Sequence, residues 1–599
     1  MAVSVQHIYP VAHLPLVLGV LRRLEVATVI ERLIPPHPAH VLSCGRGVEA
    51  LVLAILDGDH ALYKVGQRLE ERGVLDLLQS GLTRTSLHDY RLGHILDALF
   101  AANLNKVFSA IALKALEVYA LPTPWLHQDT TTIALYGAYV DEPKTARAPR
   151  PAYGHSKDGR DDLKQVLLSL GVSGDGGLPL RVGIRDGNRS DSVETPLAIE
   201  ECLALGLEGV HGIVADSKAY SRRTLGICRE HGIGLVTLVP RTCTVRQDLE
   251  VWGRQHPGLP LLLEKTGRTK TEAPRRWYGQ SVRRPVEVED SDGRVALEEV
   301  RFVVVHSSQL AQQQTQTYAK AQEKEAGAVA EHVQRVQARW FACEADAAAA
   351  LAEYEYRGPG RRGRRPQTWR YHAVHYRVVA ATRPTRRAQR GRPAKTDPVP
   401  LEAGYRLVVE VEALDNAEED NGWTVLATTV SPEVCTDAEI LQAYQEQHTT
   451  VELGFRWIKN PAAISPGWLE KPERIAALAM LTVIGLLVYS LIQRQVRLYL
   501  RTHDQQLPGN KGTTATPTAA VVLALFAQVA LVQLWLSDHE ITQVYGLQPH
   551  HLLICDALGL DHAWYATPSA HKIDQFSQIL EHGIDKYLLF VWMKLTLRC

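Results

Sequence analysis

The chain has 599 residues, which exceeds the size of one hydrophobic core and predicts two to four domains. Hydrophobic residues make up 45% of it and charged residues 22%, so a mostly disordered protein is excluded. The 66 basic and 66 acidic residues cancel, so net charge by itself argues against nucleic-acid binding. The eight cysteines include no C-x-x-C pair that would indicate a zinc ribbon.

The first part of the chain, residues 1–115, is predicted to be a helical domain. Apolar residues recur at spacings of three and four in 14–33 and 87–116. Such a domain would serve DNA binding or dimerisation, and periodicity does not separate these roles. No basic head followed by an apolar run opens the chain, so we expect no signal peptide and a cytoplasmic location.

Residues 116–245 change to a strand pattern. The segments that predict strands are 125–137, 163–187 (two strands joined by an Asp-Gly-Gly turn), the start of 210–232, and 232–240. A helix is expected to start at Asp216 or Ser217. Strands followed by a strand-helix-strand unit predict a mixed α/β sheet, which we take as the first part of a catalytic core.

Residues 246–420 are predicted to form an inserted α+β subdomain. Strand-like runs occur at 300–306, 371–382 and 405–414, with a polar helical stretch at roughly 309–355. Thirteen Lys or Arg residues and no acidic residue lie between 357 and 395. This arginine block is a candidate DNA contact, and a solvated loop is the alternative. Its densest part consists of Arg361, Arg362, Arg364 and Arg365.

Residues 421–500 are predicted to complete the core, and 501–599 to form a helical end. A strand is expected at 422–430 and one helix at 437–460, capped by Thr436 or Asp437. Two apolar runs follow at 475–493 and 519–536. They predict helices buried in a large core, and membrane spans are the alternative.

Three acidic residues carry the chemical hypothesis. Asp129 and Asp216 each follow an apolar stretch of a predicted strand, where ligands of α/β sheets gather. Each has a structural alternative: Asp216 would cap a helix, and Asp129 would belong to a turn. Glu452 lies on one helix face with Arg456 and Lys459, at spacings of four and seven.

The predicted helix around Glu452 has little room for a purely solvated face. Apolar and aromatic residues surround the Glu452 stripe, and Gln445 and His448 extend it backwards. A carboxylate in these surroundings is expected to face a site or a partner.

Several blocks of sequence resemble one family. They are WLHQDTTT, GIVADSKAYS and YQEQHTTVELGFRWIKNP, with YGHSKDGRDDLKQV, GWTVLATTV and PTAAVVLALF in support. In this order they resemble bacterial insertion-sequence transposases of the DDE class. Within that class they are closest to the group with a Tyr-Arg-Glu-Lys signature and a large insertion. The resemblance covers roughly residues 120–530 and implies a ribonuclease-H-like core, a mixed sheet flanked by helices that the insertion interrupts.

The resemblance assigns roles position by position. Asp129 and Asp216 match the two catalytic aspartates, Glu452 the catalytic glutamate, and Lys459 the lysine seven residues later. The family's tyrosine and arginine positions hold Gln445 and His448 here, and Tyr444 lies one residue earlier. Either one residue is inserted or these two roles have lapsed. The expected DNA contacts of this helix are Tyr444, His448, Arg456 and Lys459.

The implied reaction is metal-dependent cleavage at the ends of an insertion sequence, followed by strand transfer into target DNA. Three carboxylates without His or Cys suit two Mg²⁺ ions, with Mn²⁺ as a substitute. The implied partners are the terminal inverted repeats, target DNA and a second copy of the chain in a synaptic homodimer. The implied place is the bacterial cytoplasm, with the nucleoid when DNA is bound.

Three other functions stay open at this point. They are a ribonuclease-H-like nuclease without strand transfer, a decayed element protein that only binds DNA, and a membrane protein. Individual residues also have two readings. His127 would approach the metals or, more simply, pack in the core, and Trp277 would stack on a base or pack in the insertion. The charged residues of 157–164 would contact DNA or solvate a loop.

Overall fold

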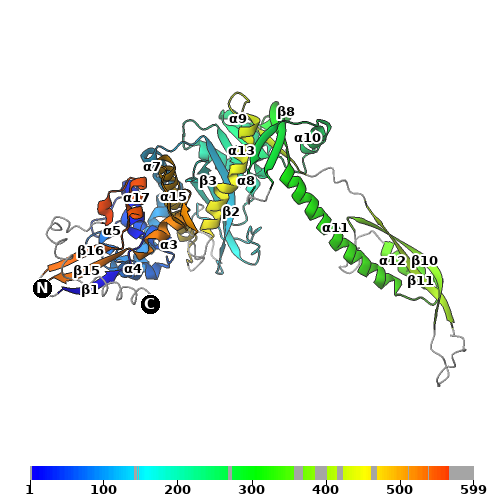
Figure 1. The fold of residues 1–599 in the computed structure, drawn as a ribbon, viewed down its shortest axis with the longest axis horizontal. Helices are drawn as coiled ribbons and strands as arrows, with labels where there is room; N and C mark the ends of the chain where they lie inside the picture. The colour runs from blue at the N-terminus through cyan, green and yellow to red at the C-terminus, as the bar shows by residue number, and fades with distance from the viewer. Residues whose placement is uncertain are drawn as a thin grey trace, which may run out of the picture. The chain divides into compact units, whose positions relative to one another are not determined.

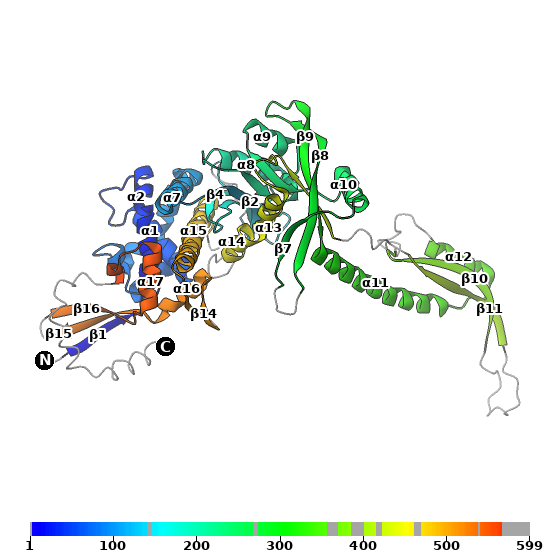
Figure 2. The same cartoon turned by 45° about the horizontal axis from the view of Figure 1, so that its top comes forward.

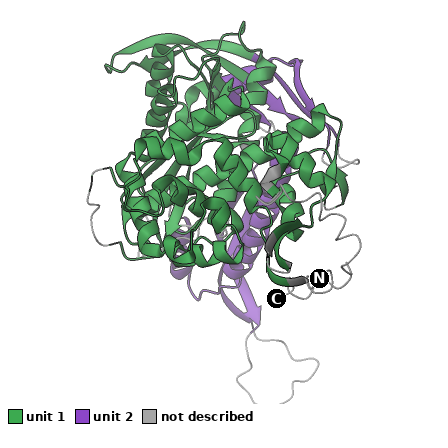
Figure 3. Cartoon of the chain, turned by 90° about the vertical axis from the view of Figure 1, so that its left-hand side faces the viewer, with its two compact units in different colours: residues 1–246, 281–303, 426–599 green, residues 247–280, 304–425 purple. Residues whose placement is uncertain are grey.

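The computed structural model describes residues 3–139, 145, 147–267, 273–355, 369–384, 401–414, 422–459, 469–509, 511–536 and 539–565. The chain divides into two compact units (Figure 3). Unit 1 comprises residues 1–246, 281–303 and 426–599, and unit 2 comprises 247–280 and 304–425. Each unit is described by itself.

Unit 1 begins with a strand and a layer of helices. The elements are β1 (Val3–Tyr9), α1 (Leu14–Arg23), α2 (Val26–Leu33), α3 (Cys44–Asp57), α4 (Leu62–Glu71), α5 (Leu75–Leu78), η1 (Arg84–Leu87), α6 (Asp89–Ala101) and α7 (Leu104–Tyr119). The 3.6-residue periodicity of the sequence is realised here, because each longer helix buries one apolar face.

The main sheet of unit 1 has the strand order β4-β3-β2-β5-β6-β12-β9-β8. The strands are β2 (Trp125–Leu135), β3 (Lys164–Ser173), β4 (Pro179–Asp186), β5 (Gly212–Ala215), β6 (Gly234–Leu238), β8 (Arg275–Glu289), β9 (Val295–Ser307) and β12 (Trp423–Thr428). β4, β3 and β2 are antiparallel neighbours, whereas β2, β5 and β6 run parallel. The sheet is therefore mixed, as the sequence predicted.

Helices pack on this sheet, and two of them, α8 and α14, contact β2 (Figure 2). They are α8 (Asp191–Leu203), η2 (Ser217–Ala219), α9 (Arg222–Glu230), α13 (Asp437–Glu446), η5 (Gln447–Thr449) and α14 (Val451–Ile458). The single helix predicted over 437–460 is wrong. A capping box between Thr436 and Glu439 starts α13, but Thr450 has φ −108° and ψ −87°, which interrupts the helix before α14.

A long apolar helix, α15 (Pro472–Thr502), fills the centre of unit 1. It packs against α3, α6, α7, α14 and β4, and it can be followed beside α7 and α3 in Figure 1. Its length and composition would allow it to cross a membrane, but 89% of its most apolar window is buried inside the protein. This burial is typical of the core helix of a large domain.

The region 501–599 is not simply helical, and here the prediction is corrected. Its described elements are β13 (Leu507–Gly509), β14 (Gly512–Thr514), α16 (Ala519–Leu525), η6 (Phe526–Gln528), β15 (Ala530–Leu536), β16 (His539–Tyr545), α17 (Pro549–Leu558) and η7 (His562–Tyr565). The apolar run 519–536 thus splits into a short helix and a strand. β15 is the central strand of an antiparallel sheet, between β1 and β16. A central strand is commonly apolar, which explains the hydrophobic sequence of this segment.

Unit 2 has its own small core. Its elements are most of α10 (Thr244–Gln255), β7 (Leu261–Lys265), α11 (Ser308–Gln337), α12 (Glu344–Glu355), β10 (His372–Pro384) and β11 (Leu401–Ala413). β10 and β11 form an antiparallel hairpin against which α11 and α12 pack. Val336, Phe341 and Leu407 are the centre of this core. The predicted helical stretch 309–355 is therefore two helices, and β8 was missed because its charged residues conceal the alternation.

Candidate active site

Two predicted acidic residues are adjacent across the sheet. β2 and β5 pair in parallel, and the last pair of their register is Gln128 opposite Ala215. The next residues are Asp129 and Asp216, and the charge of Asp216 acts on Asp129, so the two carboxylates lie close together. Asp129 lies inside its strand and not in a turn, because β2 continues beside β3. β5 does end there, which opens this point of the sheet.

Asp216 keeps its structural role as a cap while it lies beside Asp129. Its Oδ1 accepts a hydrogen bond from the Lys218 backbone N–H at 3.0 Å, within the short turn η2. The helix predicted to start at Asp216 or Ser217 starts later, at Arg222. The capping explanation and the site explanation are therefore compatible.

The pKa values of both aspartates are raised. Burial, together with the neighbouring carboxylates of Asp216 and Asp191, raises the pKa of Asp129 to about 6 against the lowering effect of Lys157. Burial likewise raises the pKa of Asp216, and Asp191 contributes in the same direction. Acidic groups that disfavour each other's charge in this way create a strong local demand for a cation.

Asp191 is a member of this acidic group that the sequence did not reveal. It is the first residue of α8, after the N-cap Ser190. Its Oδ1 accepts a hydrogen bond from the Thr130 hydroxyl at 2.6 Å, so Thr130 joins α8 to the strand that carries Asp129. A predicted helix start at Asp191 is the one sequence feature that could have pointed to this residue. It lies 25 residues before Asp216, in a segment that contains no strand pattern and no motif.

Glu452 reaches the same region from α14. This helix packs against β2 and β3, and Glu452 lies exposed in its first turn. The hydroxyl of Tyr444 lies within range of all three acids: burial, together with the charges of Asp216, Glu452 and Asp129, raises its pKa to about 12 against the lowering effect of Arg246. All three carboxylates therefore lie within electrostatic range of one phenol group.

The break between α13 and α14 changes the expected helix stripe. Arg456 and Lys459 keep their place on the Glu452 face of α14, but Gln445 belongs to a different helix. Tyr444 has all three acids within electrostatic range. His448 lies in the connecting turn η5, and its side chain is outside what the structure describes. This geometry favours the alternative of one inserted residue over a lapsed tyrosine.

The two predicted basic residues of α14 have different surroundings. Lys459 Nζ contacts Asp158 Oδ1 in the loop after β2. Arg456 is exposed. The densest part of the arginine block, Arg361, Arg362, Arg364 and Arg365, lies outside the described residues.

The carboxylates fit a divalent cation in their chemistry, although they do not form a finished metal site. Within the described ranges, no group of three or more His, Cys, Asp or Glu side chains could hold a metal ion. Mg²⁺ commonly binds through one or two carboxylates and fills its other positions with water and substrate phosphates. Asp129 and Asp216 are the two acids whose oxygen atoms could hold such an ion.

His127 is a core residue, the simpler of its two readings. Its side chain is 0% exposed, both ring nitrogens lack a hydrogen-bond partner, and burial lowers its pKa to about 4. Lys164 donates hydrogen bonds to the carbonyls of Ala138 and Tyr139, both at 2.7 Å, so it holds a turn. Trp277 is partly buried on β8, with Lys265 Nζ 5.8 Å from its ring centre.

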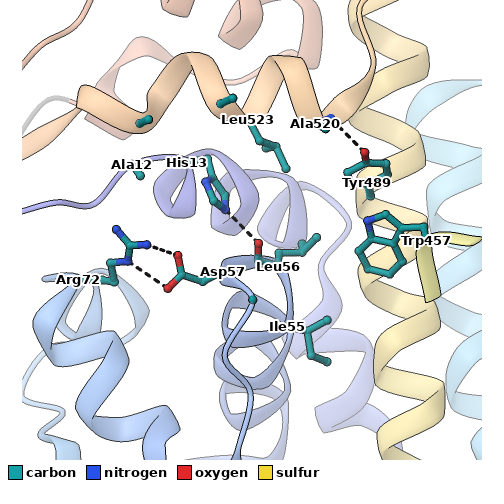
Figure 4. A pocket seen from close by; sticks show the side chains of 13 residues that line it. Ala12, His13, Ile55, Leu56, Asp57, Arg72, Trp457, Tyr489, Ala520 and Leu523 are labelled. Atoms are coloured by element: carbon teal, nitrogen blue, oxygen red, sulfur yellow. Dashed lines mark hydrogen bonds and ion pairs between the residues drawn. The ribbon is translucent and has the colours of Figure 1, made fainter. Parts of the chain in front are cut away.

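A separate cavity of about 510 Å³ lies away from the acids (Figure 4). Trp457 of α14 lines it with Tyr489 and Leu523, and Asp57 at its edge pairs with Arg72. Trp457 is five residues from Glu452, about 140° around the helix, so the two side chains serve opposite faces of α14. This cavity is therefore not part of the acidic site.

The sequence matches two known families. Residues 5–113 match a domain of unknown function (DUF4277), and residues 129–488 match the transposase DDE domain. A search of curated proteins finds no match. A solved structure, described as the cryo-EM structure of the piggyBac transposase synaptic complex with hairpin DNA, aligns with a TM-score of 0.23 and 10% identity. That alignment covers 47% of this chain and 60% of that chain.

The match to the transposase DDE domain begins at Asp129 and continues into α15, and it covers more than half of the chain. The chain therefore belongs to the transposase DDE domain family.

Proposed function

We propose that this transposase cuts the ends of its insertion sequence and joins them to target DNA, with Asp129, Asp216 and Glu452 as the catalytic acids. One observation carries the proposal. Asp129 and Asp216 directly follow the paired residues Gln128 and Ala215, and the charges of both and of Glu452 act on the Tyr444 hydroxyl. Three acids from distant parts of the sequence thus share one region of the sheet.

We further propose that strands β4, β3, β2, β5 and β6 form a ribonuclease-H-like core. The antiparallel group β4-β3-β2 followed by the parallel group β2-β5-β6 supports this. The insertion would then lie between β6 and the helices α13 and α14, which return Glu452 to the core. In the DDE family the catalytic carboxylates hold divalent metal ions. The arrangement of Asp129, Asp216 and Glu452 fits that role.

Asp129 and Asp216 would hold a divalent ion, and Glu452 would complete the ligand set once DNA is bound. When bound, two such ions supply an activated oxygen nucleophile and neutralise the leaving oxygen. The half-buried carboxylates of Asp129 and Asp216 would hold the ion, and Glu452 and Lys459 on α14 and at its end would orient the DNA next to it. Mg²⁺ is the expected ion, and Mn²⁺ should replace it.

DNA is the proposed partner of α14 and of the insertion. Arg456 and Lys459 follow Glu452 along one helix face, where they would contact phosphates next to the cut. The arginine block would contact DNA farther away. The proposed substrates are the terminal inverted repeats and target DNA, and a homodimer would hold two ends together.

A strand-transfer assay tests the proposal. Purified protein is given Mg²⁺, target DNA and duplexes that carry the terminal sequences of the element, either intact or cleaved in advance. We expect cleavage of intact ends and joining of both kinds. Cleavage without joined product would favour a nuclease, and binding without cleavage would favour a decayed element protein.

Single substitutions test the site. Asp129→Ala, Asp216→Ala and Glu452→Ala should each abolish cleavage and leave DNA binding in place. Asp162→Ala, an exposed acid paired with Arg160, is the matched control and should retain activity. Survival of cleavage in any of the three variants would refute the assignment of that residue.

A further inference from the structure

The loop that follows β2 brings charged residues to both sides of the acidic site. Within it, Lys157 points to the carboxylates at β2 and α8, and the next residue, Asp158, contacts Lys459 of α14. Two neighbours in sequence thus engage the two components that the proposed function requires, the acids and a phosphate-binding lysine. The argument that follows rests on that proposed function.

Lys157 is held firmly among oxygen atoms. Its Nζ donates hydrogen bonds to the Thr130 carbonyl at 2.7 Å and to the Thr130 hydroxyl at 2.6 Å. The same ammonium lies 3.5 Å from Asp191 Oδ2 and 3.9 Å from Asp129 Oδ1. Its side chain is only 30% exposed, which is low for a lysine. One positive charge therefore sits where the acids need a cation.

Asp158 is the counterpart on the other side. Its Oδ1 contacts the ammonium of Lys459, which lies 301 residues later in the chain. A carboxylate offers this lysine the same charge and the same oxygen acceptors as a DNA phosphate does. As long as the pair is formed, Lys459 is occupied.

The loop is built to hold these two residues in place. Ser156 is buried, and its hydroxyl accepts hydrogen bonds from the backbone N–H groups of Asp158 and Arg160 at 3.2 and 3.1 Å. The Ser156 N–H in turn donates to Asp161 Oδ1 at 2.9 Å. Gly159 closes the turn with φ +69°, a conformation that other residues rarely adopt. A merely solvated loop would not need this set of local hydrogen bonds.

We propose that Lys157 and Asp158 are internal stand-ins for the ligands of the site, Lys157 for a metal cation and Asp158 for a DNA phosphate. In the free protein they neutralise the acids and Lys459. Binding of metal and DNA must displace them, so they set the affinity of the site for both. They are positioning residues and take no part in the chemical step.

The test uses the full chain and measures binding without catalysis. Mn²⁺ binding in the absence of DNA is followed by electron paramagnetic resonance. DNA binding in EDTA is followed by fluorescence anisotropy of a labelled mixed-sequence duplex. Removal of one charge about 4 Å from a carboxylate should change affinity about tenfold at a partly exposed site. Lys157→Gln should therefore tighten Mn²⁺ binding about tenfold, and Lys157→Arg should leave it near the wild-type value.

Asp158→Asn should tighten DNA binding about fivefold and steepen its salt dependence, because one more lysine becomes available to phosphate. Asp162→Asn in the same loop is the matched control and should change neither affinity. Equal or weaker Mn²⁺ binding in Lys157→Gln, or identical DNA binding in Asp158→Asn and Asp162→Asn, would overturn the inference. A wild-type protein that binds neither Mn²⁺ nor DNA would instead overturn the proposed function.

Discussion

Asp129→Asn should make the metal-free protein more stable at neutral pH, although it abolishes cleavage. Asp129 is only 19% exposed, and its pKa of about 6 lies above the ordinary value of 3.8. A raised pKa means that the folded protein holds the proton more tightly than the unfolded chain does. The ionised carboxylate therefore costs folding free energy, and asparagine removes that cost while its Oδ1 still accepts the Thr130 N–H.

The size of the effect follows from the pKa. A separation of about two pH units corresponds to about 3 kcal/mol, since each unit is worth about 1.4 kcal/mol. The attraction of Lys157 at 3.9 Å is already part of that pKa, and solvent screening reduces the figure, so we expect about 1–3 kcal/mol above pH 7. The cost of the charge is absent below the unfolded pKa, grows through the interval from 3.8 to about 6, and is complete above it. The gain should thus fall to about one third near pH 4.5.

Urea unfolding in EDTA, followed by tryptophan fluorescence at several pH values, measures this difference. The control is Asp162→Asn, whose exposed carboxylate pairs with Arg160 and should give no pH-dependent gain. Added Mn²⁺ should stabilise the wild type and not Asp129→Asn, because only the wild type keeps the full pair of acids. A variant that is less stable than the wild type at pH 7.5, or a gain that does not vary with pH, would refute the electrostatic reasoning.

Three further predictions concern single contacts. Thr436→Ala removes the capping box of α13 and should lower the free energy of unfolding by about 1 kcal/mol in urea titrations. Arg181→Met breaks a buried ion pair with Glu194, whose side chain is 0% exposed, and should cost about 3–5 kcal/mol; an unchanged unfolding midpoint would show that the other arginines compensate fully. Tyr444→Phe should slow cleavage of terminal DNA severalfold, and Gln445→Ala should not. A slower reaction in Gln445→Ala and not in Tyr444→Phe would show that Gln445 occupies the position of the family's tyrosine.

The sequence predicted the sheet because its strands carry strong patterns. Alternating and apolar runs around Asp129 and Asp216 become β2 and β5, and the Asp-Gly-Gly turn joins β3 to β4. The region around Glu452 was correctly predicted to be helical, but it forms two helices and not one. The break between them depends on the backbone conformation of Thr450, which the residue pattern does not predict.

The rest of the site could not be read from spacing. Asp191 and Lys157 meet only through the tertiary fold, since the former begins α8 and the latter lies in a loop 34 residues earlier. A segment such as 519–536 is equally apolar as helix or strand, and its partner β1 lies at the other end of the chain. Pairing across such distances is invisible to local periodicity.

The central position of α15 has a consequence for synthesis of the protein. The helices of the first 115 residues pack around a helix that leaves the ribosome only after residue 502 has been made. Until then their apolar faces are uncovered, as with Leu51 and Leu96, which are fully buried in the finished core. The amino-terminal layer consequently matures late, and a fragment that ends near residue 115 should aggregate unless a chaperone or a co-expressed α15 segment covers it.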